Sequence, residues 1–183
     1  APVERVRSAT RDAFKNLVNL ALNEEVRFVV IAGDVFDGDW KDFSTGLWFN
    51  GQLRRLTENG IRVLLIGGNH DYQGKITRML SYPPGVLCFD DKKPHTVELH
   101  ELHVALHGQS FPRRDVSVDL SASYPPAIPG CFNIGLLHTC AEGREGHDNY
   151  APCSVAGLVK HGYDYWALGH IHQREILHEY PHI

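Results

Sequence analysis

The chain has 183 residues, of which 43% are hydrophobic and 22% charged, values typical of one globular domain with a substantial core. Its formal net charge of −4 excludes a broadly basic nucleic-acid platform, although bound divalent cations and local clusters of Lys and Arg can still attract DNA. No apolar stretch approaches the roughly 20 residues of a membrane span, so the sequence predicts no membrane association.

The first third of the chain predicts two amphipathic helices, each followed by a buried strand. Apolar side chains at helical spacing predict helices over residues 4–25 and 42–59, and Gly60 suits the C-terminal cap of the second helix. The short β-branched runs 26–32 and 61–66 are typical of strands buried on both faces. This alternation indicates βαβ crossovers and a parallel sheet.

Shorter strands dominate the rest of the predicted structure. Apolar runs between turn residues predict strands at 86–89, 95–99, 102–107, 132–137, 163–168 and 174–178. A short helix is expected at 154–160, and the prolines between 111 and 130 disfavour regular structure there.

Four short polar blocks follow four of the predicted strands, at residues 33–37, 68–71, 137–138 and 169–172. In open parallel sheets, functional groups gather at the carboxyl ends of the strands, so we expect these side chains to converge. The glycines in the blocks let the backbone turn tightly and approach a metal ion or a phosphate without a Cβ in the way.

The blocks offer carboxylate, carboxamide and imidazole groups, which suit Mn²⁺, Fe or Zn²⁺ better than a soft thiolate metal or a Ca²⁺ cage. The candidate metal ligands are Asp34, Asn69, His138, His170 and His172. Asp34 has two oxygens and can therefore bridge two cations. Two cations about 3.5–4 Å apart can activate a water and clamp a phosphate.

Three further residues complete the predicted site. His70 is the candidate catalytic residue, because it can donate to the phosphate or protonate the leaving group. Asp37 and Asp71 are candidates for orienting the histidine rings. Taken singly, each block has an ordinary explanation, such as a turn or a buried histidine with a hydrogen bond. The ordered series at four strand ends favours a metal site.

Other catalytic patterns are not supported. Residues 68–75 resemble a phosphate-binding P-loop, but the spacing is one residue too long and Ile76 replaces the Ser or Thr. His100 and His103 have i, i+3 spacing in a strand-like context, which excludes a zinc-protease helix. No G-x-S-x-G occurs, so a serine esterase is not indicated. His147, in a polar loop, either lines the rim of the site or is solvated.

The pattern resembles the calcineurin-like metallophosphoesterase superfamily, and more closely its SbcD-type DNA-repair exonuclease branch. The segments that carry the resemblance cover most of the chain and read FVVIAGDVFDG, VLLIGGNHD, ALHGQSF, FNIGLLHT and YDYWALGHIHQREIL. The resemblance implies an α/β fold, a βα sandwich of two mixed sheets flanked by helices. It identifies residues 1–183 as a metallophosphoesterase, or nuclease, domain.

The resemblance also implies roles for the site residues. Asp34 matches a carboxylate that bridges two divalent ions, Mn²⁺ or similar. His172 matches a ligand of one ion, and His70 matches the histidine that assists phosphodiester cleavage. The remaining ligands of the other ion are matched by Asn69, His138 and His170.

One departure from the family pattern concerns the second ion. No Asp-x-His block precedes Asp34, and in the family this block supplies two ligands to the ion that His172 binds. The family strands after Gly-His-x-His are also cut short, and Asp37 stands where many DNA-repair members have His. We therefore expect a domain truncated at both ends, without the first strand and the C-terminal strands, and with an incomplete second metal site.

The sequence thus predicts metal-dependent phosphodiester hydrolysis, by a DNA-repair exonuclease or endonuclease with two metal ions. The resemblance implies DNA as the substrate and an SMC-like ATPase subunit as a partner. A homodimer is a possible assembly. A phosphodiesterase or phosphatase for a small substrate stays open, as does an inactive fragment that retains the fold. The four cysteines form no CxxC pair, which predicts reduced thiols and a cytoplasmic location.

Overall fold

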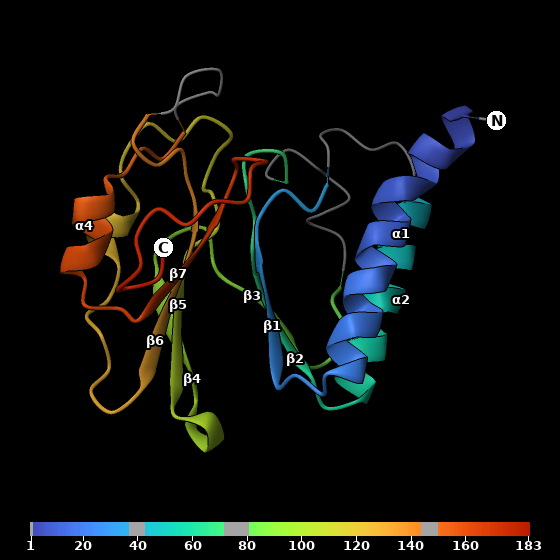
Figure 1. Cartoon of the computed structure of the whole chain (residues 1–183), viewed down its shortest axis with the longest axis horizontal. Coiled ribbons are helices and arrows are strands. Elements are labelled where there is room, and N and C mark those ends of the chain that lie inside the picture. The colour runs from blue at the N-terminus through green and yellow to red at the C-terminus, as the bar shows by residue number, and fades with distance from the viewer. Residues whose placement is uncertain (1, 37–42, 72–80, 144–149) are drawn as a thin grey trace.

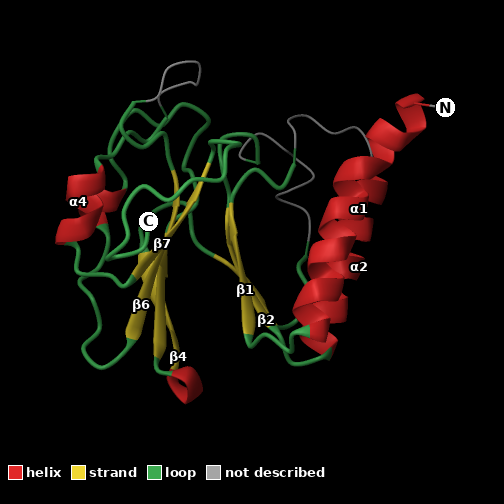
Figure 2. Ribbon diagram, in the orientation of Figure 1, coloured by secondary structure: helices red, strands yellow, loops and turns green. Residues whose placement is uncertain are grey.

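The computed structural model describes residues 2–36, 43–71, 81–143 and 150–183. Two sheets pack face to face, and helices cover the outer face of each (Figures 1 and 2). The predicted α/β sandwich of two sheets flanked by helices is therefore confirmed. No helix within these ranges has the length and apolar character that crossing a bilayer requires.

The first sheet contains three parallel strands in the order β1-β2-β3, formed by Phe28–Ala32, Arg62–Ile66 and Val86–Cys88. Two helices, α1 (Pro2–Asn23) and α2 (Phe43–Glu58), lie side by side on its outer face. Their apolar stripes meet the sheet in one cluster that includes Val18, Ala21, Phe49, Leu53, Leu56 and Val63. This packing confirms the two predicted amphipathic helices.

The second sheet has the order β4-β5-β6-β7, formed by His95–Leu99, Val104–Gly108, Phe132–His138 and Tyr165–Gly169. β4 is antiparallel to β5, and the other pairs are parallel. A 3₁₀ turn, η1 (His100–Leu102), separates β4 from β5, so the strand predicted at 102–107 begins at Val104.

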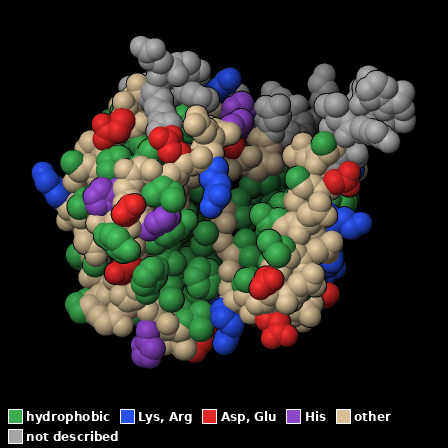
Figure 3. Space-filling model, in the orientation of Figure 1, with side chains coloured by type: hydrophobic (Ala, Val, Ile, Leu, Met, Phe, Trp, Pro, Cys, Tyr) green, Lys and Arg blue, Asp and Glu red, His purple; other side chains and the backbone are tan. Residues whose placement is uncertain are grey.

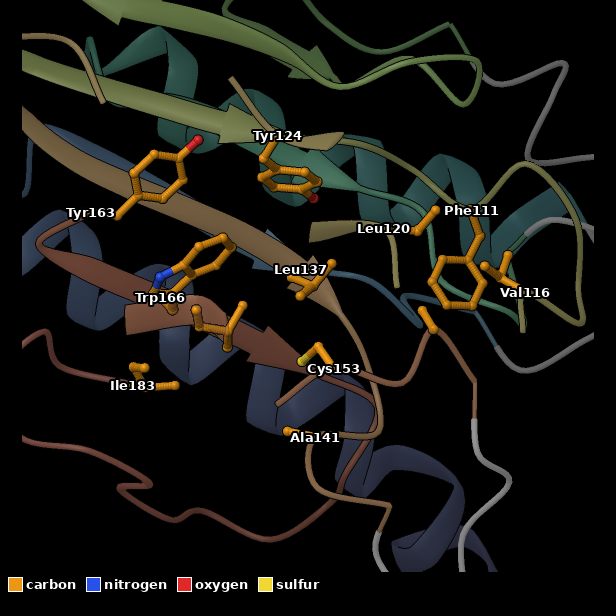
Figure 4. Close-up of a cluster of buried hydrophobic side chains, with 12 residues drawn as sticks. Phe111, Val116, Leu120, Tyr124, Leu137, Ala141, Cys153, Tyr163, Trp166 and Ile183 are labelled. Carbon is orange, nitrogen blue, oxygen red and sulfur yellow. The ribbon is translucent and has the colours of Figure 1, made fainter. Parts of the chain in front are cut away.

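Apolar side chains fill both faces of the second sheet. Leu64 and Ile66 of the first sheet meet Leu106 and Leu136 of the second between the two layers. A second apolar cluster, drawn in Figure 4, lies on the outer face of this sheet. It is covered by α4 (Val155–Lys160) and by the segment that contains the 3₁₀ turn η2 (Ser121–Ser123). The stretch from 111 to 130 is irregular apart from η2, as its prolines predict.

Two details of the predicted strands are wrong. Residues 174–178 form no strand, because the chain turns back on itself and Leu177 N–H donates to Ile183 O at 2.6 Å. In the described structure β1 pairs only with β2, so its five residues are half-buried rather than buried on both faces. A β-branched apolar run therefore lies along a sheet edge.

His107 is fully buried and joins three strands of the second sheet. Its Nε2 lies 3.0 Å from Asn133 Oδ1, and its Nδ1 lies 2.8 Å from the Thr96 hydroxyl. Because Asn133 Oδ1 can only accept, we assign the proton to Nε2, and the Thr96 hydroxyl donates to Nδ1. Tyr163 stacks on the imidazole at a centroid distance of 4.2 Å. Burial lowers the pKa of His107 below its ordinary value of 6.5.

We predict that His107 makes the fold sensitive to acid. As the pH falls below 6.5, this residue takes up a proton in the unfolded chain before it does so in the folded protein. The free energy of unfolding therefore decreases from pH 6.5 down to the lower pKa of the folded state, and the contribution is fully present above pH 6.5.

Urea unfolding in EDTA, over a series of pH values on both sides of 6.5, measures this effect. The variant His107→Gln should lose stability at neutral pH and show a flatter pH profile in the acidic window. The same pH profile in the variant and the wild type would contradict the prediction.

Candidate metal centre

The four polar blocks meet at one edge of the sandwich. Parallel pairing places Ala32 of β1 beside Ile66 of β2, and His138 of β6 beside Gly169 of β7. The blocks begin at or just after these four strand ends, which all lie in the upper part of the view in Figure 1. The predicted convergence at the carboxyl ends of the strands is therefore what the fold produces.

Four of the five predicted metal ligands lie together. Ligand atoms of Asp34, His138 and His170 all lie within 4.8 Å of one another. His138 Nε2 is 3.3 Å from Asp34 Oδ2 and 2.9 Å from Asn69 Oδ1. His138 is fully buried and Asn69 is 3% exposed, whereas Asp34 and His170 are half-buried. The group is thus buried on the side of His138 and Asn69 and accessible on the side of Asp34 and His170.

Hydrogen bonding identifies which nitrogen of His138 faces this group. Nδ1 lies 2.9 Å from the carbonyl oxygen of Ala32, which can only accept, so we assign the proton to Nδ1. Nε2 then directs its lone pair toward the oxygens of Asp34 and Asn69. Lone pairs of nitrogen and oxygen that converge without a donor suit a cation, and a backbone carbonyl behind a ligating histidine is a common arrangement.

The backbone around His138 has no room for additional atoms. A Cβ on Gly33 or Gly68 would collide with the His138 ring, and one on Gly169 would overlap the carbonyl oxygen of Ala32. Asp34 and His170 have positive φ angles of 51° and 93°, conformations that side-chain-bearing residues rarely adopt. Strained backbone at two candidate ligands is a feature of functional sites.

Asp71 connects the two loops that carry the ligands of the first sheet. Its carboxylate accepts from Val35 N–H at 3.3 Å, Phe36 N–H at 3.0 Å and Gly68 N–H at 2.9 Å. These partners are backbone amides, whereas the sequence predicted contact with histidine rings. Burial raises the pKa of Asp71, and the three amides offset only part of this effect.

Asp34 experiences opposing electrostatic effects. Burial by itself would raise the pKa of Asp34, but contacts with His138 and His70 outweigh it and lower the pKa. The contribution of His138 requires a protonated Nε2, and it is therefore lost when the Nε2 lone pair faces a cation. The backbone N–H of His70 also donates to Asp34 Oδ1, at 3.1 Å. This bond fixes the candidate catalytic histidine immediately beside the candidate bridging carboxylate, with its side chain half-buried.

The remaining predicted site residues lie outside this group of ligands or outside the described residues. His172 is exposed and lies outside the group formed by Asp34, His138 and His170. Asp37 and His147 lie outside the described residues. The predicted roles of the site residues stay predictions.

Sequence reasoning did not identify two residues that contact the site. The Phe111 ring lies perpendicular to the His138 ring, with centroids 5.1 Å apart. Ser110 accepts from Gly67 N–H, next to the loop that carries Asn69. The available signal was the polar pair Gln109-Ser110, directly after the end of β5 at the same edge of the sandwich.

A groove runs beside the candidate metal centre, between the edges of the two sheets. It has a volume of about 430 Å³ and is lined by β1 residues, by β7 and by the segment 171–177. Hydrophobic side chains gather between the two sheets on the same view of the molecule (Figure 3). The groove gives the metal edge an open side next to the half-buried strand β1.

Comparison with known proteins agrees with this geometry. Residues 7–174 match the sequence profile of the calcineurin-like phosphoesterases. The chain is 35% identical over 176 residues to the metallophosphoesterase YhaO of Bacillus subtilis (strain 168). It is 28% identical over 168 residues to the DNA double-strand break repair protein Mre11 of Saccharolobus solfataricus, and 28% identical over 173 residues to that of Sulfurisphaera tokodaii.

These matches cover most of this chain but less than half of the relatives. They span 94% of this chain for YhaO and 89% and 90% for the two Mre11 proteins. In each case the match covers 43% of the relative's length. The Mre11 matches agree with the DNA-repair branch that the sequence resembles.

We predict that Gly169→Ala damages the metal centre, whereas Gly51→Ala does not. A Cβ at Gly169 would overlap Ala32 O, and it would displace the acceptor that orients His138. Gly51 lies in α2, and a Cβ added there would meet no other atom within 4 Å. Gly169→Ala should cost about 1–3 kcal/mol of stability, and Gly51→Ala should be neutral or stabilising by up to about 1 kcal/mol.

Urea unfolding measures the stability of both variants, and Mn²⁺ titration measures their metal binding. Gly169→Ala should bind Mn²⁺ more weakly than Gly51→Ala. Equal stability and equal Mn²⁺ affinity in the two variants would show that the close approach is not required.

Proposed function

Because the chain belongs to the calcineurin-like phosphoesterase family, we propose that the protein hydrolyses phosphodiester bonds with the help of divalent metal ions. The supporting observation is the convergence of ligand atoms around His138 Nε2, which lies 3.3 Å from Asp34 Oδ2 and 2.9 Å from Asn69 Oδ1. His170 extends this set from the neighbouring strand end. Mn²⁺ is the proposed ion, and Fe and Zn²⁺ are alternatives that the same nitrogen and oxygen ligands accept.

Three of the ligands have distinct tasks. Asp34 contributes a negative charge, Asn69 a neutral oxygen, and His138 a nitrogen whose direction is fixed by Ala32. When bound, the cation would stabilise negative charge that develops on the phosphate and make a nearby water more acidic. Because His138 and Asn69 are buried, substrate approaches from the side of Asp34 and His170, which are half-buried.

His70 is the proposed catalytic residue. The bond from its backbone N–H to Asp34 Oδ1 places its Cα beside the metal edge, and its side chain is half-buried. An imidazole in this position can donate a hydrogen bond to the phosphate or a proton to the leaving oxygen. Its proposed task is therefore at the substrate rather than at the metal.

A second metal ion is also part of the proposal, with Asp34 and His172 as its ligands from this chain. In the described part of the chain, the His, Cys, Asp and Glu side chains that could hold a metal form one group, and His172 is not in it. We therefore propose that the second position is incomplete in residues 1–183, which form a truncated metallophosphoesterase domain. Asp37, which lies outside the described residues, is proposed to support the site, and Asp71 to hold the loops together.

DNA is the proposed substrate, because several relatives carry the name DNA double-strand break repair protein Mre11. An SMC-like ATPase partner is proposed on the same family resemblance. A cytoplasmic location is proposed from the cysteine pattern, and a homodimer is a further proposal. A small phosphodiester or phosphate monoester is the second candidate substrate, and the net charge of −4 favours it because polyanions are repelled. Because the match covers only 43% of the length of YhaO, the activity of the whole protein is also a proposal.

We predict that His138→Ala and His70→Ala fail at different steps. In the full-length protein with Mn²⁺, both variants should lose hydrolysis of bis-(p-nitrophenyl) phosphate. His138→Ala should also bind Mn²⁺ at least about 100-fold more weakly, because a buried ligand is removed. His70→Ala should keep its Mn²⁺, because the substitution leaves in place the backbone N–H that donates to Asp34.

Steady-state rates and Mn²⁺ titrations separate these two losses. Wild-type hydrolysis that continues at full rate in excess EDTA would contradict the metal-dependent function. Normal hydrolysis by His70→Ala would remove His70 from the mechanism.

The salt dependence of binding should distinguish DNA from a small substrate. We predict that the His70→Ala variant, loaded with Mn²⁺, binds duplex DNA. Its affinity for DNA should fall steeply as the salt concentration rises. Each neutralised phosphate contributes about 0.9 to the slope of log affinity against log salt. Fluorescence anisotropy over a salt series measures this slope, with bis-(p-nitrophenyl) phosphate inhibition as the small-ligand control. A flat slope for DNA would favour the small substrate.

A further inference from the structure

Ser110 and Phe111 lie at the end of β5, outside every predicted ligand block, yet both contact the metal edge. They contact the peptide groups of Gly67 on both sides. Gly67 N–H donates to Ser110 Oγ at 2.8 Å, and Phe111 N–H donates to Gly67 O at 2.9 Å. Gly67 is separated from Asn69 by a single residue. This double contact fixes the backbone from which the Asn69 ligand projects.

The Ser110 hydroxyl uses both of its hydrogen-bonding roles. It accepts from Gly67 N–H and donates to Phe89 O at 2.6 Å, while Ser110 N–H donates to Asp90 O at 3.0 Å. Phe89 directly follows β3 of the first sheet, whereas Ser110 follows β5 of the second. The side chain is 7% exposed, so loss of the hydroxyl would leave buried partners unsatisfied.

Phe111 acts on a different ligand. Its ring is 2% exposed and lies perpendicular to the His138 imidazole, with an interplanar angle of 89° and centroids 5.1 Å apart. This edge-to-face arrangement is favourable for aromatic rings. Together with the hydrogen bond from His138 Nδ1 to Ala32 O, it fixes the plane of the imidazole.

We propose that Ser110 and Phe111 are positioning residues that hold Asn69 and His138 in the geometry for metal binding. Ser110 acts through the Gly67 peptide, and Phe111 acts through both that peptide and the His138 ring. The proposal rests on the proposed metal-dependent function, since it assigns a task toward the ion at that site. Neither residue touches the reacting atoms.

The test measures metal binding in the full-length protein, with the metal ion alone as the probe. Mn²⁺ affinity is followed by the electron paramagnetic resonance signal of free Mn²⁺, and coordination is followed by the visible spectrum of bound Co²⁺. Ser110→Ala and Phe111→Leu should each bind Mn²⁺ about 10–100-fold more weakly and alter the Co²⁺ spectrum. Ser110→Thr retains the hydroxyl and should restore most of the affinity.

Two matched variants control for a general loss of stability. Ser121→Ala removes a buried hydroxyl that donates to Asp119, and Phe49→Leu removes a buried ring in the cluster beneath α1 and α2. Both should lower stability while leaving the Mn²⁺ affinity and the Co²⁺ spectrum unchanged. A purely structural role would instead give all four variants the same small effect on metal binding.

The outcomes separate this proposal from the proposed function. Wild-type Mn²⁺ affinity and an unchanged Co²⁺ spectrum in folded Phe111→Leu and Ser110→Ala would overturn the positioning role. If Ser110→Ala does not fold, Phe111→Leu and Ser110→Thr decide the result. A wild-type protein that binds Mn²⁺ but hydrolyses no phosphodiester would overturn the proposed function. In that case the Mn²⁺ affinities of the variants alone would support or refute the positioning role. A wild-type protein that binds no Mn²⁺ would overturn both.

Discussion

The hydrogen bond from His138 Nδ1 to the carbonyl oxygen of Ala32 is the contact on which the metal edge depends. It joins the last residue of β6 to the last residue of β1, and thus the second sheet to the first. The same bond decides the tautomer of the imidazole and directs Nε2 toward Asp34 and Asn69. A single backbone acceptor therefore links the two layers at this edge and orients the nitrogen that faces the candidate ligands.

The requirement for close approach explains the surroundings of this bond. Two backbones and an imidazole meet at one point, so Gly33, Gly68 and Gly169 leave no Cβ there. Asp71 then holds the two loops of the first sheet by their amides, a contact that does not depend on the side chains at those positions. The site is built mainly from backbone restraints, with few side chains performing the chemistry.

Local patterns in the sequence predicted much of this arrangement. Apolar runs ended by glycine predicted β1 and β2 of the first sheet. The rule that parallel strands end at one edge predicted that Asp34, Asn69, His138 and His170 lie together. The partners of Asp71 could not be predicted, because a carboxylate beside a loop can bind a ring or an amide equally well.

The prediction also had limits that follow from its local character. An apolar run of five residues has the same pattern at a sheet edge as at its centre, so the half-buried state of β1 was not visible. The run at 174–178 resembled a strand, but its partner, Ile183, is brought close by a turn that hydrophobic periodicity does not encode. Pairing partners are a property of the whole fold.

The bond between Ala32 and His138 also has a kinetic consequence. Its two residues are 106 positions apart, and the parallel strands between them pair only after long loops have closed. The candidate ligands therefore converge only where this long-range pairing has formed, and a cation that binds them stabilises the native state over the unfolded chain. Metal supply during synthesis would then influence how much of the newly made protein reaches its folded form.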